Sequence, residues 1–231
     1  MIALSDYARV VVFTGAGMSA ESGVPTYRGR GGIWQQYDYE DYACESAFRR
    51  HPQRVLDFHE LRREQVLGCE PHAGHAHLAS LQRTHPSLSI VTQNIDGMHQ
   101  RAGGAVAAEL HGSLWRLRCA QHGVVEDAAA GRFVRRDCTQ CGRPLRPDIT
   151  WFGDMIDEAV FAQARALIEM CSLFVCIGTS AVVWPAAGLI PFDVRQRPHL
   201  VEINPEPTDG SARFDRVLRA SASALPELLV P

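Results

Sequence analysis

Short apolar runs alternate along this chain with segments of helical periodicity. Four runs rich in β-branched and aromatic residues occupy residues 10–13, 88–92, 173–177 and 200–203, and each is followed within two residues by Gly or Asn. Because such runs are apolar at nearly every position, they are typical of parallel strands covered on both faces. We therefore expect four buried strands that end in turns.

Helical patterns fill the spaces between these runs. Residues 52–67 carry apolar side chains near helical spacing, residues 73–83 form a second candidate, and residues 157–170 are rich in alanine. Strands that alternate with helices indicate an α/β fold with a parallel, Rossmann-like sheet.

The character of the chain changes between residues 114 and 150. Cysteines, glycines, short alternations and Arg-Pro replace the strand and helix patterns there. We interpret this segment as a small inserted module. The predicted division is a catalytic domain of residues 1–113 and 151–231, with residues 114–150 as the insert.

Composition excludes several classes of protein. A net charge of −3 gives no electrostatic footprint for nucleic acid or an anionic membrane. The sequence contains no signal-peptide pattern and no apolar stretch of the roughly 18 residues that span a membrane. We expect a soluble, cytoplasmic protein. All 23 basic residues are arginine, which either codon usage or avoidance of self-modification would explain.

Four residues in the insert have the spacing of metal ligands. Cys119 and His122 form one pair, and Cys138 and Cys141 form a second pair with the same spacing. Two such pairs suit one tetrahedral zinc ion, and four protein ligands leave no open position for catalysis. We predict one structural zinc ion; the alternative is a set of free thiols beside an exposed His122.

A glycine-rich turn follows the first predicted strand. Gly15 and Gly17 permit close backbone approach, and a helix that begins near Ser19 would present free N–H groups to a pyrophosphate. This pattern alone is common. The continuation through Pro25, Tyr27 and further glycines to Trp34 adds residue types expected of a flap over a phosphate-bearing ligand.

Further motifs follow the glycine-rich turn along the chain. They are Gln93-Asn94-Ile95-Asp96 after the second strand, His111-Gly112, the cysteine module, Trp151-Phe152-Gly153-Asp154, Gly178-Thr179-Ser180 and Asn204-Pro205. Together with residues 15–28, they resemble the sirtuins over nearly the whole chain. The resemblance implies an NAD-dependent protein-lysine deacylase that binds NAD as co-substrate and acyl-lysine proteins as substrates, and releases nicotinamide and O-acyl-ADP-ribose.

The resemblance also assigns roles. It makes His111 the general base on a ribose hydroxyl, Asp96 the contact of the nicotinamide carboxamide, and Asn94 a group that positions ribose and water. Extended peptide would lie between Phe152-Gly153 and Val182-Val183. The implied NAD-binding residues are Gly15, Ala16, Gly17, Ser19, Ala20, Pro25, Tyr27, Arg28, Trp34, Gln93, Asn94, Ile95, Asp96, Gly178, Thr179, Ser180, Asn204, Pro205, Glu206 and Ala222.

One stretch bears on the acyl group. Residues 58–63, with Ala43 before them, are similar to the desuccinylase and demalonylase branch of sirtuins, in which a Tyr-x-x-Arg pair binds a distal carboxylate. Here Arg62 is present but His59 occupies the tyrosine position. Because residues three apart share a helix face, an imidazole N–H and Arg62 could still clamp a carboxylate. If His59 binds as imidazolium, desuccinylation should weaken above about pH 7. The alternative is that Arg62 and Arg63 form a solvated basic face.

Two other functions remain open at this point. A mono-ADP-ribosyltransferase or NAD hydrolase would use the same bond cleavage without an acyl acceptor. A non-catalytic module that binds NAD or acyl-lysine would show binding without turnover, although the presence of His111 and Asp96 argues against it.

Overall fold

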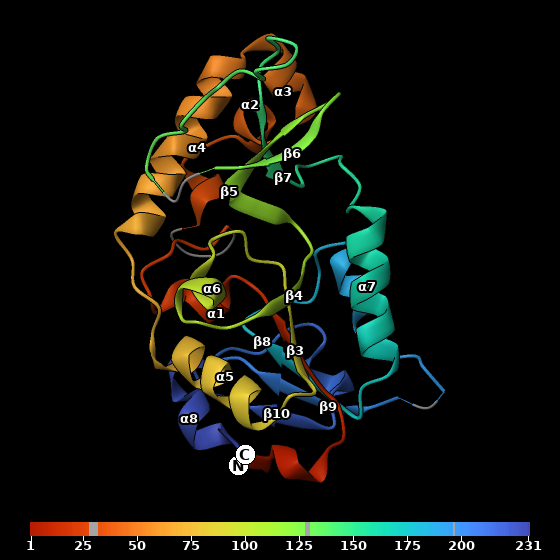
Figure 1. Cartoon of the computed structure of the whole chain (residues 1–231). Coiled ribbons are helices and arrows are strands. Elements are labelled where there is room, and N and C mark those ends of the chain that lie inside the picture. The colour runs from red at the N-terminus through yellow and green to blue at the C-terminus, as the bar shows by residue number, and fades with distance from the viewer. Residues whose placement is uncertain (28–31, 128–129, 196) are drawn as a thin grey trace.

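The fold consists of two lobes (Figure 1). It is known from a computed structural model that describes residues 1–27, 32–127, 130–195 and 197–231. The lower lobe in Figure 1 contains a parallel sheet with helices on both faces, and the upper lobe contains helices α2, α3 and α4 beside a small antiparallel sheet.

The large sheet has six parallel strands in the order β10-β9-β8-β2-β3-β4. The four predicted strands form its centre, as β2 (Val10–Thr14), β3 (Leu88–Thr92), β8 (Leu173–Ile177) and β9 (His199–Ile203). Nearly all of their residues are buried, which explains their continuous apolar character. The parallel α/β fold predicted from the sequence is confirmed.

The two edge strands were not predicted. They are β4 (Val106–Glu109) and β10 (Arg216–Leu218), which are short and only partly buried. A third short pair joins the chain ends, where β1 (Ile2–Ala3) lies parallel to β11 (Leu229–Val230). Strands this short carry too few apolar positions to stand out from loops.

Helices cover both faces of the large sheet. On one face, α5 (Ala73–Thr84) and α8 (Leu225–Leu228) bury Leu78 and Leu225 against the strands. On the other face, α7 (Glu158–Glu169) buries Ala164 and Ile168. The predicted helices at 73–83 and 157–170 are therefore confirmed to within a residue or so at their ends.

The upper lobe combines two parts of the chain. Helices α3 (Glu45–Arg50) and α4 (Pro52–Leu67) share one core with strands β5 (Gly112–Cys119) and β7 (Arg146–Ile149). Outside this core, α2 (Tyr39–Tyr42) packs against α3 and α4, and β6 (Gly123–Glu126) pairs with β5. The predicted helix at 52–67 is confirmed at both ends. The predicted domain division stays a prediction, but α4 packs with the cysteine-bearing segment.

The remaining elements are short. They are α1 (Gly17–Ala20), α6 (Met98–Arg101) and the 3-10 turns Leu4–Asp6, Ile33–Gln35, Ala186–Leu189, Ser211–Arg213 and Ala222–Ala224. Among the described helices, none has both the length and the apolar character that crossing a membrane requires.

Candidate active site

The turns after β2 and β8 meet at the carboxyl edge of the large sheet. Gly17 N donates to Gly178 O at 2.7 Å, and Gly15 N donates to Ile177 O at 3.0 Å. A Cβ atom on Gly15 would lie 2.6 Å from Thr179 Cβ, and one on Gly17 would lie 2.7 Å from Gly178 Cα. Only glycine permits this approach, so the two predicted ligand-binding turns form one surface.

Asn94 is fixed within this surface. Its backbone N donates to Thr92 Oγ1 at 3.0 Å, and its side-chain Nδ2 donates to Gly15 O at 3.0 Å. The same Nδ2 lies 3.4 Å from Ser19 Oγ. Asn94 therefore joins the end of β3 to the glycine-rich turn, where switch-point ligands bind in α/β proteins.

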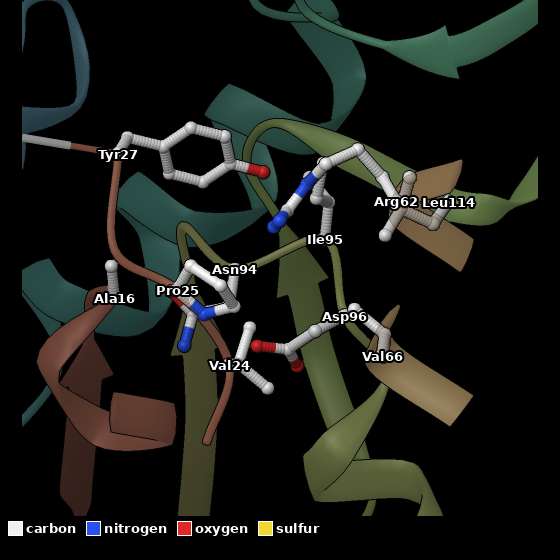
Figure 2. Close-up of a pocket in the computed structure, with 10 residues that line it drawn as sticks. All are labelled: Ala16, Val24, Pro25, Tyr27, Arg62, Val66, Asn94, Ile95, Asp96 and Leu114. Carbon is white, nitrogen blue, oxygen red and sulfur yellow. The ribbon is translucent and has the colours of Figure 1, made fainter. Parts of the chain in front are cut away.

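Asp96 lies two residues farther along, in a narrow pocket between the lobes. The pocket is lined by Ala16, Val24, Pro25, Tyr27, Arg62, Val66, Asn94, Ile95, Asp96 and Leu114 (Figure 2). The Asp96 carboxylate accepts a hydrogen bond from Met98 N at 2.9 Å. Burial raises the pKa of Asp96, and hydrogen bonds from Met98 N and the Ser19 hydroxyl oppose that rise.

Trp115 supports the backbone of Asp96 from the far side. Its Nε1 donates to Asp96 O at 2.9 Å. Gly97 follows with a φ of +74°, and a Cβ there would lie 2.5 Å from the same indole nitrogen. Glycine at this position thus admits both the left-handed turn and the indole.

Across the pocket, the Tyr27 hydroxyl and the Arg62 guanidinium point toward one another (Figure 2). Burial raises the pKa of Tyr27, and the nearby Arg62 charge opposes the rise. The pocket therefore combines a buried carboxylate, an amide, a phenol and a guanidinium within apolar walls.

His111 stands at the end of β4, where the chain enters β5. Its Nδ1 lies 2.9 Å from Gln93 O. A carbonyl only accepts hydrogen bonds, so Nδ1 carries the proton and Nε2 retains a free lone pair. Burial lowers the pKa of His111, and its bond to Gln93 O acts in the opposite direction. The imidazole is therefore neutral near pH 7 and suited to accept a proton.

The predicted adenosine side is assembled around Thr179. Gln93 Nε2 donates to Thr179 Oγ1 at 3.1 Å, and Asn204 Nδ2 donates to Thr179 O at 3.1 Å. Ser180, Pro205 and Glu206 lie in the loops that follow β8 and β9. Ala222 is farther along the chain, but its carbonyl lies against Gly74, and neighbouring Ser223 N donates to Glu21 after α1 at 2.8 Å. Arg28, predicted to contact phosphate, lies outside the described residues.

Comparisons with known proteins agree with this geometry. The family model described as "Sir2 family" matches residues 15–185. The chain belongs to the Sir2 family of NAD-dependent protein deacylases. It is 39% identical to an NAD-dependent protein deacylase of Methylococcus capsulatus, over all of this chain and 94% of that protein. It is also 39% identical to one of Mycobacterium tuberculosis, over 96% of both chains.

Solved structures of Sir2 proteins also resemble this fold closely. A Sir2 homologue in complex with NAD matches with a TM-score of 0.86 and 37% identity, covering 96% of this chain and 88% of that one. A Sir2 complex with a deacetylated peptide and 3′-O-acetyl ADP-ribose matches with a TM-score of 0.83 and 27% identity, covering 97% and 95%. The family predicted from the sequence is confirmed, with NAD as co-substrate.

The Sir2 enzyme described here also has a cluster suited to zinc. Donor atoms of Cys119, His122, Cys138 and Cys141 lie within 4.8 Å of one another. His122 Nδ1 lies 3.5 Å from Cys119 Sγ and 3.3 Å from Cys138 Sγ, and the Cys119 and Cys141 sulfurs are 3.6 Å apart. Two sulfurs bound tetrahedrally at about 2.3 Å lie roughly 3.8 Å apart, and a sulfur and a nitrogen roughly 3.5 Å apart. Three thiolates and one imidazole thus fit a single structural zinc ion.

Of the predicted acyl-pocket residues, Arg62 lines the pocket beside Asp96, whereas His59, Ala43, Phe152, Gly153, Val182 and Val183 do not line it. Arg62 and Arg63 are 4% and 0% exposed, so the alternative of a solvated basic face is wrong. Ala43 is buried at the end of α2, and its carbonyl accepts from Phe152 N at 3.0 Å. Val182 and Phe152 are both partly exposed, at 42% and 38%.

His59 is buried in an apolar setting. Its ring stacks on Trp151 with centroids 5.8 Å apart, and a contact with the Tyr42 backbone favours its charged form. Burial, reinforced by the charges of Arg62 and Arg146, lowers the pKa of His59 to about 3. In the empty site His59 is therefore neutral near pH 7, which argues against the imidazolium considered from the sequence.

Sequence reasoning missed a network below the pocket. His75 Nε2 lies 3.4 Å from Ser19 Oγ, and His99 Nε2 lies 3.1 Å from Thr14 Oγ1. Burial lowers the pKa of both rings, to about 2 for His75 and about 4 for His99. These neutral rings support the turn that carries Ser19. The one available signal was polar residues placed on the buried faces of α5 and α6.

Proposed function

We propose that this Sir2 enzyme removes acidic acyl groups, succinyl and malonyl, from protein lysines in addition to acetyl groups. The observation that carries the proposal is the buried Arg62 guanidinium, which faces the pocket opposite Tyr27 (Figure 2). A cation held out of water at an acyl site favours a substrate that brings its own carboxylate.

His59 supports the same proposal. Its buried ring carries one N–H, as neutral imidazole always does, and a bound acidic acyl group would accept from it in place of the Tyr42 backbone. Arg62 also bonds to Gln65 Oε1 at 2.7 Å, which holds its side chain toward one side of the pocket. The proposed clamp thus consists of one cation and one neutral donor, with small Ala43 as the residue proposed to leave room for the acyl group.

The geometry of the pocket supports a proposed catalytic role for each of three residues. NAD, when bound, supplies the ribose carbon that the acyl oxygen attacks as nicotinamide leaves. Asp96 and Asn94 orient that end of the pocket, since both are fixed by backbone hydrogen bonds. His111 Nε2 then accepts a ribose hydroxyl proton.

Peptide recognition belongs to two backbone segments. We propose that Phe152-Gly153 and Val182-Val183 flank an extended acyl-lysine peptide by strand addition. Gly153 adopts a φ of +85°, so the chain turns directly after Phe152. Recognition through backbone atoms makes acyl-lysine proteins of diverse sequence the substrates.

The test is mass spectrometry of matched acetyl-lysine and succinyl-lysine peptides, with and without NAD, while nicotinamide release is followed. Arg62→Met removes a charge-assisted contact of about 2–3 kcal/mol, so kcat/KM on the succinyl peptide should fall about 30- to 160-fold. Acetyl activity should stay within about threefold, because that substrate lacks the carboxylate.

Arg165→Met is the matched control, since Arg165 lies on α7 with its side chain 67% exposed. It should change neither activity. Equal succinyl activity in Arg62→Met would contradict the clamp, and nicotinamide release without a change in the peptide would favour an ADP-ribosyltransferase or NAD hydrolase.

A further inference from the structure

Arg63 follows Arg62 on α4 but points into the other side of the upper lobe. Its Nη1 donates to Asp127 Oδ2 at 2.7 Å, and its Nε donates to Ala130 O at 2.8 Å. The two side chains of this ion pair are 0% and 3% exposed. The pair therefore links α4 to the segment between β6 and Cys138.

Aromatic rings enclose the Arg63 guanidinium. Its Cζ lies 4.5 Å from the centroid of Phe133 and 5.2 Å from that of Trp115. Stacking against rings restricts a guanidinium in directions that its in-plane hydrogen bonds leave open. Hydrogen bonds thus fix the guanidinium within its own plane, and the aromatic rings limit its movement perpendicular to that plane.

Glu60, one turn earlier on α4, docks on the same segment. Its Oε1 accepts from Phe133 N at 3.0 Å, and its Oε2 accepts from Arg136 Nη2 at 2.7 Å. Residues three apart share a helix face, so Glu60 and Arg63 form one polar face directed at the zinc-bearing segment. His59 and Arg62 occupy the adjacent face of the same helix, toward the acyl pocket.

Stability alone does not account for a fully buried ion pair. The cost of removing two charges from water often cancels their attraction, and apolar replacements of similar volume are commonly neutral or stabilising. What the pair supplies is a directional contact that fixes where α4 sits along and around its axis.

We propose that the Arg63–Asp127 ion pair is a positioning device for acyl selectivity. It fixes the position of α4 along its axis and its rotation about that axis, so that the adjacent Arg62 reaches the distal carboxylate of an acidic acyl group. This inference rests on the proposed activity toward acidic acyl groups. Arg63 and Asp127 act through Arg62 and are positioning residues.

The nicotinamide side of the site has support of its own. Trp115 contacts Arg63 through its ring, but it holds Asp96 through the hydrogen bond from Nε1 to Asp96 O and lies against Gly97, and an apolar methionine at position 63 should leave both contacts in place. Asp96 and His111 should therefore stay in place when the ion pair is replaced. The expected defect is one of acyl recognition.

The experiment uses the double variant Arg63→Met/Asp127→Leu, which removes both charges together and avoids a lone buried charge. Thermal unfolding and zinc content establish that it folds. Its KM for the succinyl-lysine peptide should rise about tenfold with kcat changed less than about threefold, and its KM for the acetyl-lysine peptide should change less than about threefold.

The matched control is Arg197→Met/Asp215→Leu, a partly exposed ion pair between the start of β9 and the start of β10. It should leave the ratio of the two KM values unchanged. Arg63→Lys keeps the charge but loses the Nε bond to Ala130, so its KM for the succinyl peptide should lie between those of wild type and the double variant. This variant decides the question if the double variant does not fold.

The outcomes separate the two proposals. Wild-type enzyme that shows no NAD-dependent desuccinylation overturns both. Desuccinylation that depends on Arg62, with an unchanged ratio of KM values in the Arg63 variants, overturns the positioning role alone. Equal losses on both peptides would show that the ion pair is merely structural.

Discussion

At the scale of single residues, burial keeps two histidines neutral, and the two have different roles. His111 is held by one hydrogen bond to Gln93 O, which leaves its Nε2 as a base. His59 stacks on Trp151 and contacts the Tyr42 backbone. The first ring can move a proton in the reaction, whereas the second can only donate or accept a hydrogen bond.

The pH dependence of the two acyl activities follows from these pKa shifts. A pKa of about 3 keeps His59 uncharged at every pH from about 5 upward, so its charge does not change near neutrality. The ratio of desuccinylation to deacetylation should therefore be constant between about pH 6 and 8. His111 must be neutral for either reaction, and its lowered pKa places the shared acid limb below about pH 6.5.

The measurement is kcat/KM for both peptides across this range, with His59→Phe as the control that removes the N–H but not a charge. That variant should lower succinyl activity at all pH values and leave the shape of the profile unchanged. A succinyl activity that falls above pH 7 while acetyl activity holds would show that His59 binds as a cation.

At the scale of elements, the sequence predicted α4 to the residue but not what its faces contact. Pro52 at the start and Gly68 after the end mark the helix, and its apolar spacing is clear. That Arg63 would be buried depended on Asp127, 64 residues away in the chain. Local patterns carry no information on such pairings. For the same reason they could not show that His59 packs against Trp151, which is 92 residues away in the chain.

The small antiparallel sheet is the element that most depends on metal. Cys119 ends β5, Cys138 lies between β6 and β7 in the chain, and both belong to the core of the upper lobe. We expect one zinc ion per chain, and its removal by a chelator should lower the melting temperature. Hydrogen exchange should rise first in β5–β7 and next in α4, since Arg63 and Glu60 tie that helix to the metal-bearing segment.

His122→Cys is the control for this experiment, because four thiolates bind zinc as well as three thiolates and an imidazole. It should retain one metal ion and normal exchange. Metal-free protein with unchanged melting and exchange would instead favour the interpretation of free thiols.

At the scale of the whole molecule, every cationic side chain is arginine and none is lysine. A guanidinium with a pKa above 12 keeps its proton and is a poor nucleophile toward acyl donors, whereas a lysine amine reacts. An enzyme of this composition offers no side-chain amine that could carry the modification it removes. This consequence holds whether codon usage or selection produced the composition.

Incubation with succinyl-CoA should therefore leave no stable adduct on any side chain. Intact-mass spectrometry after hydroxylamine, which removes thioesters from the cysteines, would check this, with the α-amino group as the one remaining amine. Arg165→Lys places an amine on the exposed face of α7 and should gain a hydroxylamine-resistant succinyl group. NAD should then reverse that adduct when wild-type enzyme is added, because an exposed acyl-lysine is the proposed substrate; an adduct that forms equally on wild type would show that another side chain reacts.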